Sequence, residues 1–112
     1  MDKKITIQAA THGLKVTQAS DISESRVELK ADAVIVGSGA GGAIAAYELA
    51  SKGKKVIVLE AGPYVPSEKF SEMMAIAMGT LYQDHGGQSN THGDISILQG
   101  ACVGGSTVVN AA

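Results

Sequence analysis

The chain has 112 residues, a formal net charge of −2, a hydrophobic fraction of 45% and a charged fraction of 18%. This composition is typical of a globular protein that forms one small domain or part of a larger one, and it excludes the basic field that nucleic-acid binding requires. No apolar run approaches the ~20 residues that span a bilayer, so we expect a cytoplasmic protein without a transmembrane segment, with peripheral membrane association left open.

Residues 1–30 are predicted to form an N-terminal extension with a small β-hairpin. Polar and apolar residues alternate from Lys4 to Gln8 and again from Leu14 to Thr17, on either side of a short turn. A polar, turn-like cluster at residues 20–25 then separates the hairpin from the rest of the chain. His12 is interpreted as a solvated turn residue.

Residues 32–62 carry the pattern of a nucleotide-binding βαβ unit. The β-branched run Val34–Val36 suits a buried parallel strand, and Gly37, Gly39 and Gly42 come after it at the G-x-G-x-x-G spacing. In such a turn the first glycine permits the bend, the second lets the backbone approach a pyrophosphate, and the third lets helix and strand pack closely. The helix after the turn directs its first N–H groups at the phosphates.

Positions beyond the glycines favour the same interpretation. The helix is predicted to run from about Gly41 to Lys52, with the small Ala46 on its buried face. The apolar run at residues 56–59 predicts a second parallel strand, which ends at Glu60, 21 residues after Gly39. A carboxylate at this spacing accepts hydrogen bonds from the adenosine ribose and disfavours a 2′-phosphate. The alternative is a glycine-rich turn in an ordinary α/β domain with a surface glutamate.

Apolar residues recur at helical spacing in the next segment. Pro63 and Pro66 exclude a continued strand, and Ser67 is expected to cap a helix that ends near Gly79 or Tyr82. The pattern favours a face that packs against a core or a partner over one that lines a substrate passage. This apolar face consists of Phe70, Met73, Met74, Ala77 and Leu81.

No metal site is predicted. Residues 83–94 are polar and rich in glycine, which is typical of a mobile surface loop. His85 and His92 lie in this loop with two aspartates nearby, but their spacing matches no standard set of metal ligands. The single cysteine, Cys102, excludes both an internal disulfide and a cysteine-based metal cluster.

A second glycine-rich stretch occupies residues 99–112, after a strand predicted at Ile95–Leu98. Its glycines and hydroxyl residues offer closely spaced N–H groups and little side-chain bulk, so a flat or anionic group could approach the main chain. A glycine-rich turn before another strand explains the stretch nearly as well.

Three motifs together make the chain resemble the N-terminal part of the glucose-methanol-choline (GMC) family of flavoprotein oxidoreductases. They are the glycine turn at Gly37–Gly42, the Leu-Glu-Ala-Gly-Pro strand end at Leu59–Pro63, and Gly-x-x-x-Gly-Gly-Ser-Thr-x-x-Asn at Gly100–Asn110. The resemblance covers about residues 31–112. It implies an α/β fold, in which a Rossmann-like FAD-binding βαβ unit with a parallel sheet forms the N-terminal, truncated portion of a domain.

The resemblance implies FAD as cofactor and hydride transfer to flavin from the CH–OH group of a small-molecule alcohol. It implies the pyrophosphate over the first glycine turn, the ribose on Glu60, and the second motif near the flavin. Val109 stands where a histidine often bonds the flavin in this family, which favours a non-covalent cofactor. Ala101 replaces a frequent Arg or Lys. The implied cofactor-binding residues are Gly37, Ser38, Gly39, Ala40, Gly41, Gly42, Glu60, Ala61, Gly104, Gly105, Ser106, Thr107 and Asn110.

No catalytic residue is assigned, because the catalytic histidine of the resembling family lies far C-terminal of the region of resemblance. Two other interpretations therefore stay open. The first is a non-catalytic nucleotide-binding fragment, or one subunit of a split enzyme that needs a companion polypeptide. The second is a NAD-dependent Rossmann domain of another family.

Overall fold

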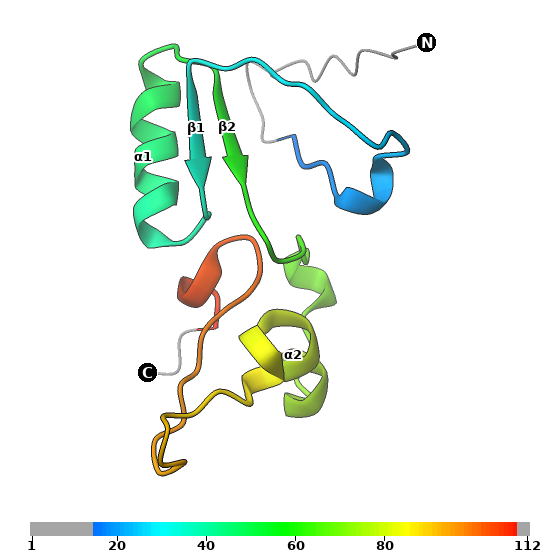
Figure 1. Ribbon diagram of the computed structural model, residues 1–112, viewed down its shortest axis with the longest axis vertical. Coiled ribbons are helices and arrows are strands. Elements are labelled where there is room, and N and C mark those ends of the chain that lie inside the picture. Colours follow the sequence, from blue (N-terminus) through cyan, green and yellow to red (C-terminus); the bar gives the residue numbers. More distant parts are fainter. Residues whose placement is uncertain (1–14, 110–112) are drawn as a thin grey trace.

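A two-stranded parallel sheet and one crossover helix form the upper part of the molecule in Figure 1. The computed structural model describes residues 15–109. Strand β1 (Ala33–Val36) pairs with β2 (Val56–Leu59) in parallel, with Ala33 opposite Val56, and α1 (Ala40–Ser51) connects them. The predicted βαβ unit is confirmed, and α1 begins and ends one residue earlier than expected.

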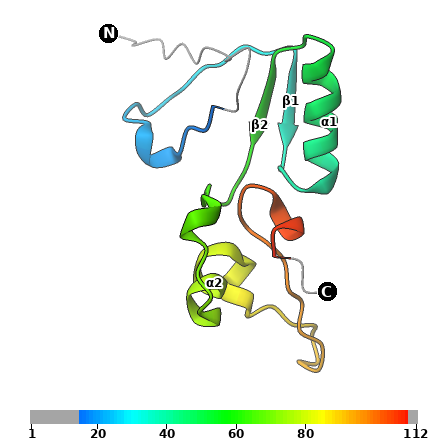
Figure 2. The same ribbon diagram turned by 180° about the vertical axis from the view of Figure 1, so that it is seen from behind.

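Helix α1 covers one face of this sheet, as the opposite views in Figures 1 and 2 show. Ile35 points toward the helix, since its side chain lies close to Gly42 in the first turn of α1. The alternate residues of β1 point the other way, because side chains alternate across a strand. Val34 and Val36 are accordingly 58% and 85% exposed. The sheet thus has one covered and one open apolar face.

The segment after β2 forms a shorter helix than predicted. A 3₁₀ helix spans Ser67–Lys69, the chain is then extended, and α2 runs only from Met74 to Leu81. The expected N-cap at Ser67 is wrong, since Ser67 is the first residue of the 3₁₀ helix, Pro66 is its N-cap, and Met73 is the N-cap of α2. Ser71 explains part of the break, because its hydroxyl accepts a hydrogen bond from the Met73 N–H at 3.1 Å and so competes with helical bonding.

Two other sequence predictions differ from the structure or lie outside it. Ile95–Leu98 forms no strand; the region instead folds back on itself, with one isolated bridge between Ser89 and Ser96. The first arm of the predicted hairpin, Lys4–Gln8, lies outside the described residues together with His12, and no strand forms over residues 15–17. Nowhere in residues 15–109 is a helix both long and apolar enough to cross a membrane.

A small apolar core lies below the sheet, between the end of α2 and the C-terminal segment. Leu81, Cys102 and Val109 are its buried members, with Cys102 only 1% exposed. The N–H of Ala101 donates to the carbonyl of Leu81 at 2.7 Å, which holds the two segments together. Of the predicted apolar face, Leu81 alone is buried; Phe70, Met73 and Met74 are exposed.

Candidate nucleotide-binding site

The first glycine turn leads directly from β1 into α1. Gly37 adopts a φ of 89°, in the left-handed region that favours glycine, and its N–H donates to the Leu59 carbonyl at 2.7 Å. A Cβ on Gly42 would overlap the Gly37 carbonyl oxygen, so this position also requires glycine. On the side where a Cβ of Gly39 would project, no atom lies within 4 Å, so a ligand can reach the backbone where the first N–H groups of α1 have no helical partner.

Glu60 comes directly after the last residue of β2, and its carboxylate faces the glycine turn. It accepts hydrogen bonds from the backbone N–H and the hydroxyl of Ser38, at 2.8 and 2.6 Å, and from the Gly62 N–H at 3.1 Å. Burial would raise the pKa of Glu60, but the hydrogen bonds from Ser38, Gly62 and Ala61 together hold that pKa below its ordinary value. The site therefore carries a negative charge at neutral pH.

Ser38 also connects this turn to the second glycine-rich stretch. Its hydroxyl donates to Glu60 and accepts a hydrogen bond from the Gly104 N–H at 2.9 Å. A Cβ on Gly105 would lie 2.9 Å from the Gly39 Cα, so the two stretches are in close contact. No spacing rule predicts this link from the sequence, although a hydroxyl residue inside the turn is a signal that could have suggested it.

The strand end at Leu59–Pro63 forms a second contact with the same stretch. The Val103 N–H donates to the Pro63 carbonyl at 3.0 Å. A Cβ on Gly62 would overlap the Ala101 carbonyl, so the backbones pass each other directly. The three motifs of the sequence thus converge at the carboxyl ends of β1 and β2, where ligands of parallel α/β sheets bind.

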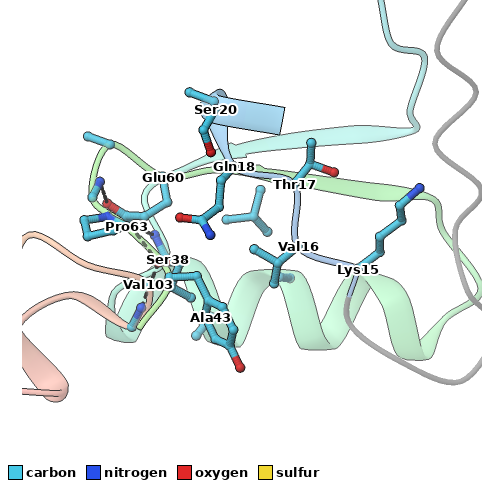
Figure 3. A pocket seen from close by; sticks show the side chains of 17 residues that line it. Lys15, Val16, Thr17, Gln18, Ser20, Ser38, Ala43, Glu60, Pro63 and Val103 are labelled. Carbon is cyan, nitrogen blue, oxygen red and sulfur yellow. Dashed lines mark hydrogen bonds between the residues drawn. The ribbon is translucent and has the colours of Figure 1, made fainter. Parts of the chain in front are cut away.

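A cavity of about 730 Å³ opens beside this convergence, which is within the usual range for a small-molecule site. Figure 3 shows Glu60 and Ser38 at one end of it and the segment Lys15–Ser20 across it. Small apolar side chains of α1 and β2 form its floor. They belong to Ala43, Ala46 and Val58.

Of the other residues that the sequence predicts to bind the cofactor, some line the cavity and others lie outside it. Ser106 and Thr107 are exposed and serve the local turn: Ser106 Oγ accepts from the Gly100 N–H at 3.0 Å, and Thr107 donates to the Gly104 carbonyl at 2.6 Å. Asn110 lies outside the described residues. Ala40 and Gly41 lie in the first turn of α1, and Ala61 lines the cavity next to Glu60.

Two residue types that often carry chemistry take no part in the site. His85 and His92 are exposed in the loop after α2, and the described part of the chain contains no group of three or more metal-ligating side chains. Burial raises the pKa of the Cys102 thiol, and the negative charge of Glu60 raises it further. Cys102 is therefore a protonated core residue and a poor nucleophile.

Comparison with known proteins gives a family model and several relatives. The model described as "FAD binding domain" matches residues 32–91, which include the glycine turn and Glu60. Long-chain-alcohol oxidase FAO4B of Arabidopsis thaliana is 38% identical over 109 residues, or 97% of this chain and 14% of that protein. Long-chain-alcohol oxidase FAO4A of the same plant is 37% identical over 102 residues, or 91% of this chain and 14% of that protein.

A bacterial relative carries a more general name. An uncharacterized GMC-type oxidoreductase of Sinorhizobium fredii, y4nJ, is 43% identical over 90 residues, which are 79% of this chain and 18% of that protein. The chain therefore spans between 14% and 18% of the length of these three relatives.

Proposed function

Because this chain belongs to the FAD-binding domain family and is an N-terminal FAD-binding part of a GMC flavoprotein, we propose that it is the cofactor-binding portion of an oxidoreductase. The proposed enzyme oxidises the CH–OH group of an alcohol and passes a hydride to the flavin. The cofactor is FAD, because the FAD-binding family model matches the region that contains the glycine turn. FAD therefore takes the place of NAD, which the alternative of a NAD-dependent Rossmann domain would require.

One observation carries the proposal: the hydroxyl of Ser38 links both glycine-rich stretches to Glu60. It donates to the carboxylate and accepts from the Gly104 N–H, so the proposed ribose ligand Glu60 and the second glycine-rich stretch both contact the same turn. FAD needs such an arrangement, because its pyrophosphate lies between an adenosine and a flavin. The open backbone at Gly39 fits the pyrophosphate between them.

The residues of this site are proposed to bind and orient FAD, and none of them is assigned a proton transfer. The N–H groups at the start of α1 contact the pyrophosphate, and Glu60 accepts hydrogen bonds from the adenosine ribose. Gly104 and Gly105 are proposed to approach the flavin end, together with the neighbouring Ser106 and Thr107. Asn110 is assigned to the same end by the sequence motif alone. Bound FAD supplies the hydride-accepting ring, which the protein positions.

An alcohol is proposed as the donor because relatives that cover most of this chain are named long-chain-alcohol oxidases. The region shared with them contains the cofactor site, and none of its residues is assigned to substrate binding. The proposed substrate class is therefore an alcohol that acts as a CH–OH donor.

A second candidate is a cofactor-binding subunit that acts only with further polypeptide. The exposed apolar surface favours it, because such surface normally marks a protein interface. Tyr47 of α1 is 72% exposed, and the open sheet face lies in the same unit. The exposed apolar residues of the sheet and helices include Val34, Val36, Ile44, Tyr47, Leu59, Met73, Met74 and Ile76.

The change Glu60→Gln tests the proposed site. An amide would keep the size but lose the charge, and one of the two oxygen positions, which accept from Ser38 and from Gly62, would become a donor that faces another donor. We expect FAD to bind on the order of tenfold more weakly or worse, since a charged hydrogen bond contributes about 1.5 to 3 kcal/mol. Titration of the apo protein with FAD, followed by flavin fluorescence, measures this.

Glu48→Gln is the matched control, because Glu48 is exposed on α1 and its carboxylate pairs with Lys52 at 3.6 Å, away from the cavity. That variant should bind FAD like the wild type. Equal FAD affinity in wild type and Glu60→Gln would remove Glu60 from the cofactor site.

The subunit candidate is tested by the behaviour of the 112-residue chain expressed alone. We expect it to bind a hydrophobic dye and to oxidise no alcohol when FAD and an artificial electron acceptor are added. Added companion polypeptide should displace the dye. A monodisperse chain that binds no dye and turns over an alcohol would contradict the need for a companion.

A further inference from the structure

We propose that Gln18, at the start of the 3₁₀ helix Ala19–Asp21, recognises the adenine ring of bound FAD through its side-chain amide. The sequence placed residues 1–30 in a peripheral extension, yet the segment Lys15–Ser20 forms a wall of the cavity that contains Glu60. This inference rests on the proposed function and adds a residue that forms hydrogen bonds with the adenine base.

The segment Lys15–Ser20 lies where it can contact a nucleotide bound at Glu60. In Figure 3 Lys15–Ser20 runs across the cavity beside β2 and α1, and the Gln18 amide extends toward Ser38. Thr17 points to the opposite side of the segment. If the ribose lies on Glu60, the base bonded to that ribose is close enough to enter this cavity, which Glu60 and Gln18 both line.

The local structure anchors the backbone of Gln18. Its backbone N–H donates to the Asp21 carboxylate at 3.0 Å, and its carbonyl accepts from the Asp21 N–H at 2.9 Å. Asp21 thus closes a short turn on both sides of the residue, so the amide projects from an anchored point. Asp21 itself does not line the cavity.

The chemistry of the walls fits a purine. Ala43, Ala46 and Val58 line the cavity with small apolar side chains, which suit the faces of an aromatic base. A glutamine amide offers one acceptor and a donor side by side, and this pair matches the donor and acceptor of an adenine edge. On the edge that carries N7, adenine offers an acceptor and the N6–H donor, whereas guanine offers two acceptors, N7 and O6. The amide oxygen would therefore lose its partner on guanine, so the amide would favour adenine.

The segment Lys15–Ser20 could have a different role, in which it acts as a strap that occupies the cofactor site and competes with FAD. The structure favours a wall, because a cavity of about 730 Å³ persists with the segment in place. All residues from 15 to 20 are exposed, so none is buried in the site as a plug would be. Removing an amide from a plug would strengthen cofactor binding, whereas removing it from a wall would weaken binding.

The test is a titration of the full chain with FAD, ADP, GDP and FMN, followed by chemical-shift changes so that weak binding is measured. We expect Gln18→Ala to bind FAD and ADP roughly tenfold more weakly and to lose the preference for ADP over GDP. FMN, which has no adenosine, should bind both proteins equally. Gln83→Ala is the matched control, because Gln83 is exposed and does not line the cavity.

The outcomes distinguish a failure of FAD binding by the chain from a failure of the role proposed for Gln18. If the wild type binds neither FAD nor ADP, the proposed function itself fails, and the role of Gln18 fails with it. If the wild type binds both and Gln18→Ala binds ADP equally well with the same purine preference, only the role of Gln18 is overturned. Tighter FAD binding by Gln18→Ala would also overturn it and would identify the segment as a competing strap.

Discussion

The βαβ unit (residues 32–62) and the small core around Leu81, Cys102 and Val109 differ in what holds each of them together. The βαβ unit contains most hydrogen bonds of the site, yet none of its residues is fully buried. The small core has buried side chains, and none of its three residues lines the cavity. A glycine turn obtains its geometry from local backbone rules, whereas burial requires neighbours from elsewhere in a chain.

The two regions meet at a few backbone contacts, and the site lies there. Gly62 passes against Ala101, Pro63 accepts a hydrogen bond from Val103, and Ser38 accepts one from Gly104. If this joint is what assembles the site, disturbing it should affect cofactor binding more than disturbing either region alone.

Gly62→Val should have the largest effect. A Cβ at this position overlaps the Ala101 carbonyl, so the two backbones must separate and move Glu60 relative to Gly104. We expect a cost of about 3 kcal/mol, or about a hundredfold loss of FAD affinity, measured by titration with FAD.

Gly79→Ala provides the matched control, because a Cβ at Gly79 in α2 meets nothing within 4 Å. Alanine should instead stabilise the helix by roughly 0.5 to 1 kcal/mol. Wild-type affinity in Gly62→Val would mean that the two regions bind FAD without this joint.

Leu81→Ala should have the next largest effect, and on stability more than on binding. Leu81 is 6% exposed and its side chain fills the small core, so its truncation should lower the free energy of unfolding by about 2 kcal/mol. Denaturant unfolding of the chain measures this. Val34→Ala, on the open sheet face, should cost less than about 1 kcal/mol.

Equal losses in Leu81→Ala and Val34→Ala would show that the open sheet face is covered in solution. That result would contradict the contrast between the two regions and would support self-association through the sheet.

The parts that could be predicted from the sequence are those whose geometry depends on nearby residues in the chain and not on packing with distant ones. The run Val34–Val36 and the spacing of the glycines predicted strand, turn and helix to within one residue at the helix ends, because each depends on neighbours in the chain. The position of Glu60 after β2 was predicted for the same reason. Its bonds to Ser38, 22 residues away, could not be read from either residue alone.

The failures concern elements that depend on partners. The segment Ile95–Leu98 has the composition of a strand, but a strand needs a neighbouring strand to pair with, and its main partner here is a tight turn of its own loop. The helix expected from Ser67 begins only at Met74, because Ser71 offers the backbone a competing bond. The wall at Lys15–Ser20 could not be predicted, since only tertiary structure brings it to the cavity.

The smallest expected effect is a dependence of stability on pH. Burial would raise the pKa of Glu60, but the bonds from Ser38, Gly62 and Ala61 lower it from an ordinary value of 4.5. A carboxyl group whose pKa is depressed on folding stabilises the folded state at every pH above its unfolded pKa. That contribution is lost as the pH falls from about 4.5 through the lower folded-state pKa, because the protonated group no longer accepts these bonds.

Thermal unfolding of wild type and Glu60→Gln between neutral and acidic pH measures this contribution directly. The difference in Tm between the two proteins should be constant above the ordinary pKa and should shrink below it, since the variant has no carboxylate to lose at this position. Glu48→Gln, which changes an exposed carboxylate outside the cavity, is the matched control. A Tm difference that stays constant into acid, or grows there, would mean that the charge of Glu60 does not hold the glycine turn. The bonds to Ser38 would then be a consequence of the turn, and the βαβ unit would keep its geometry through the backbone alone.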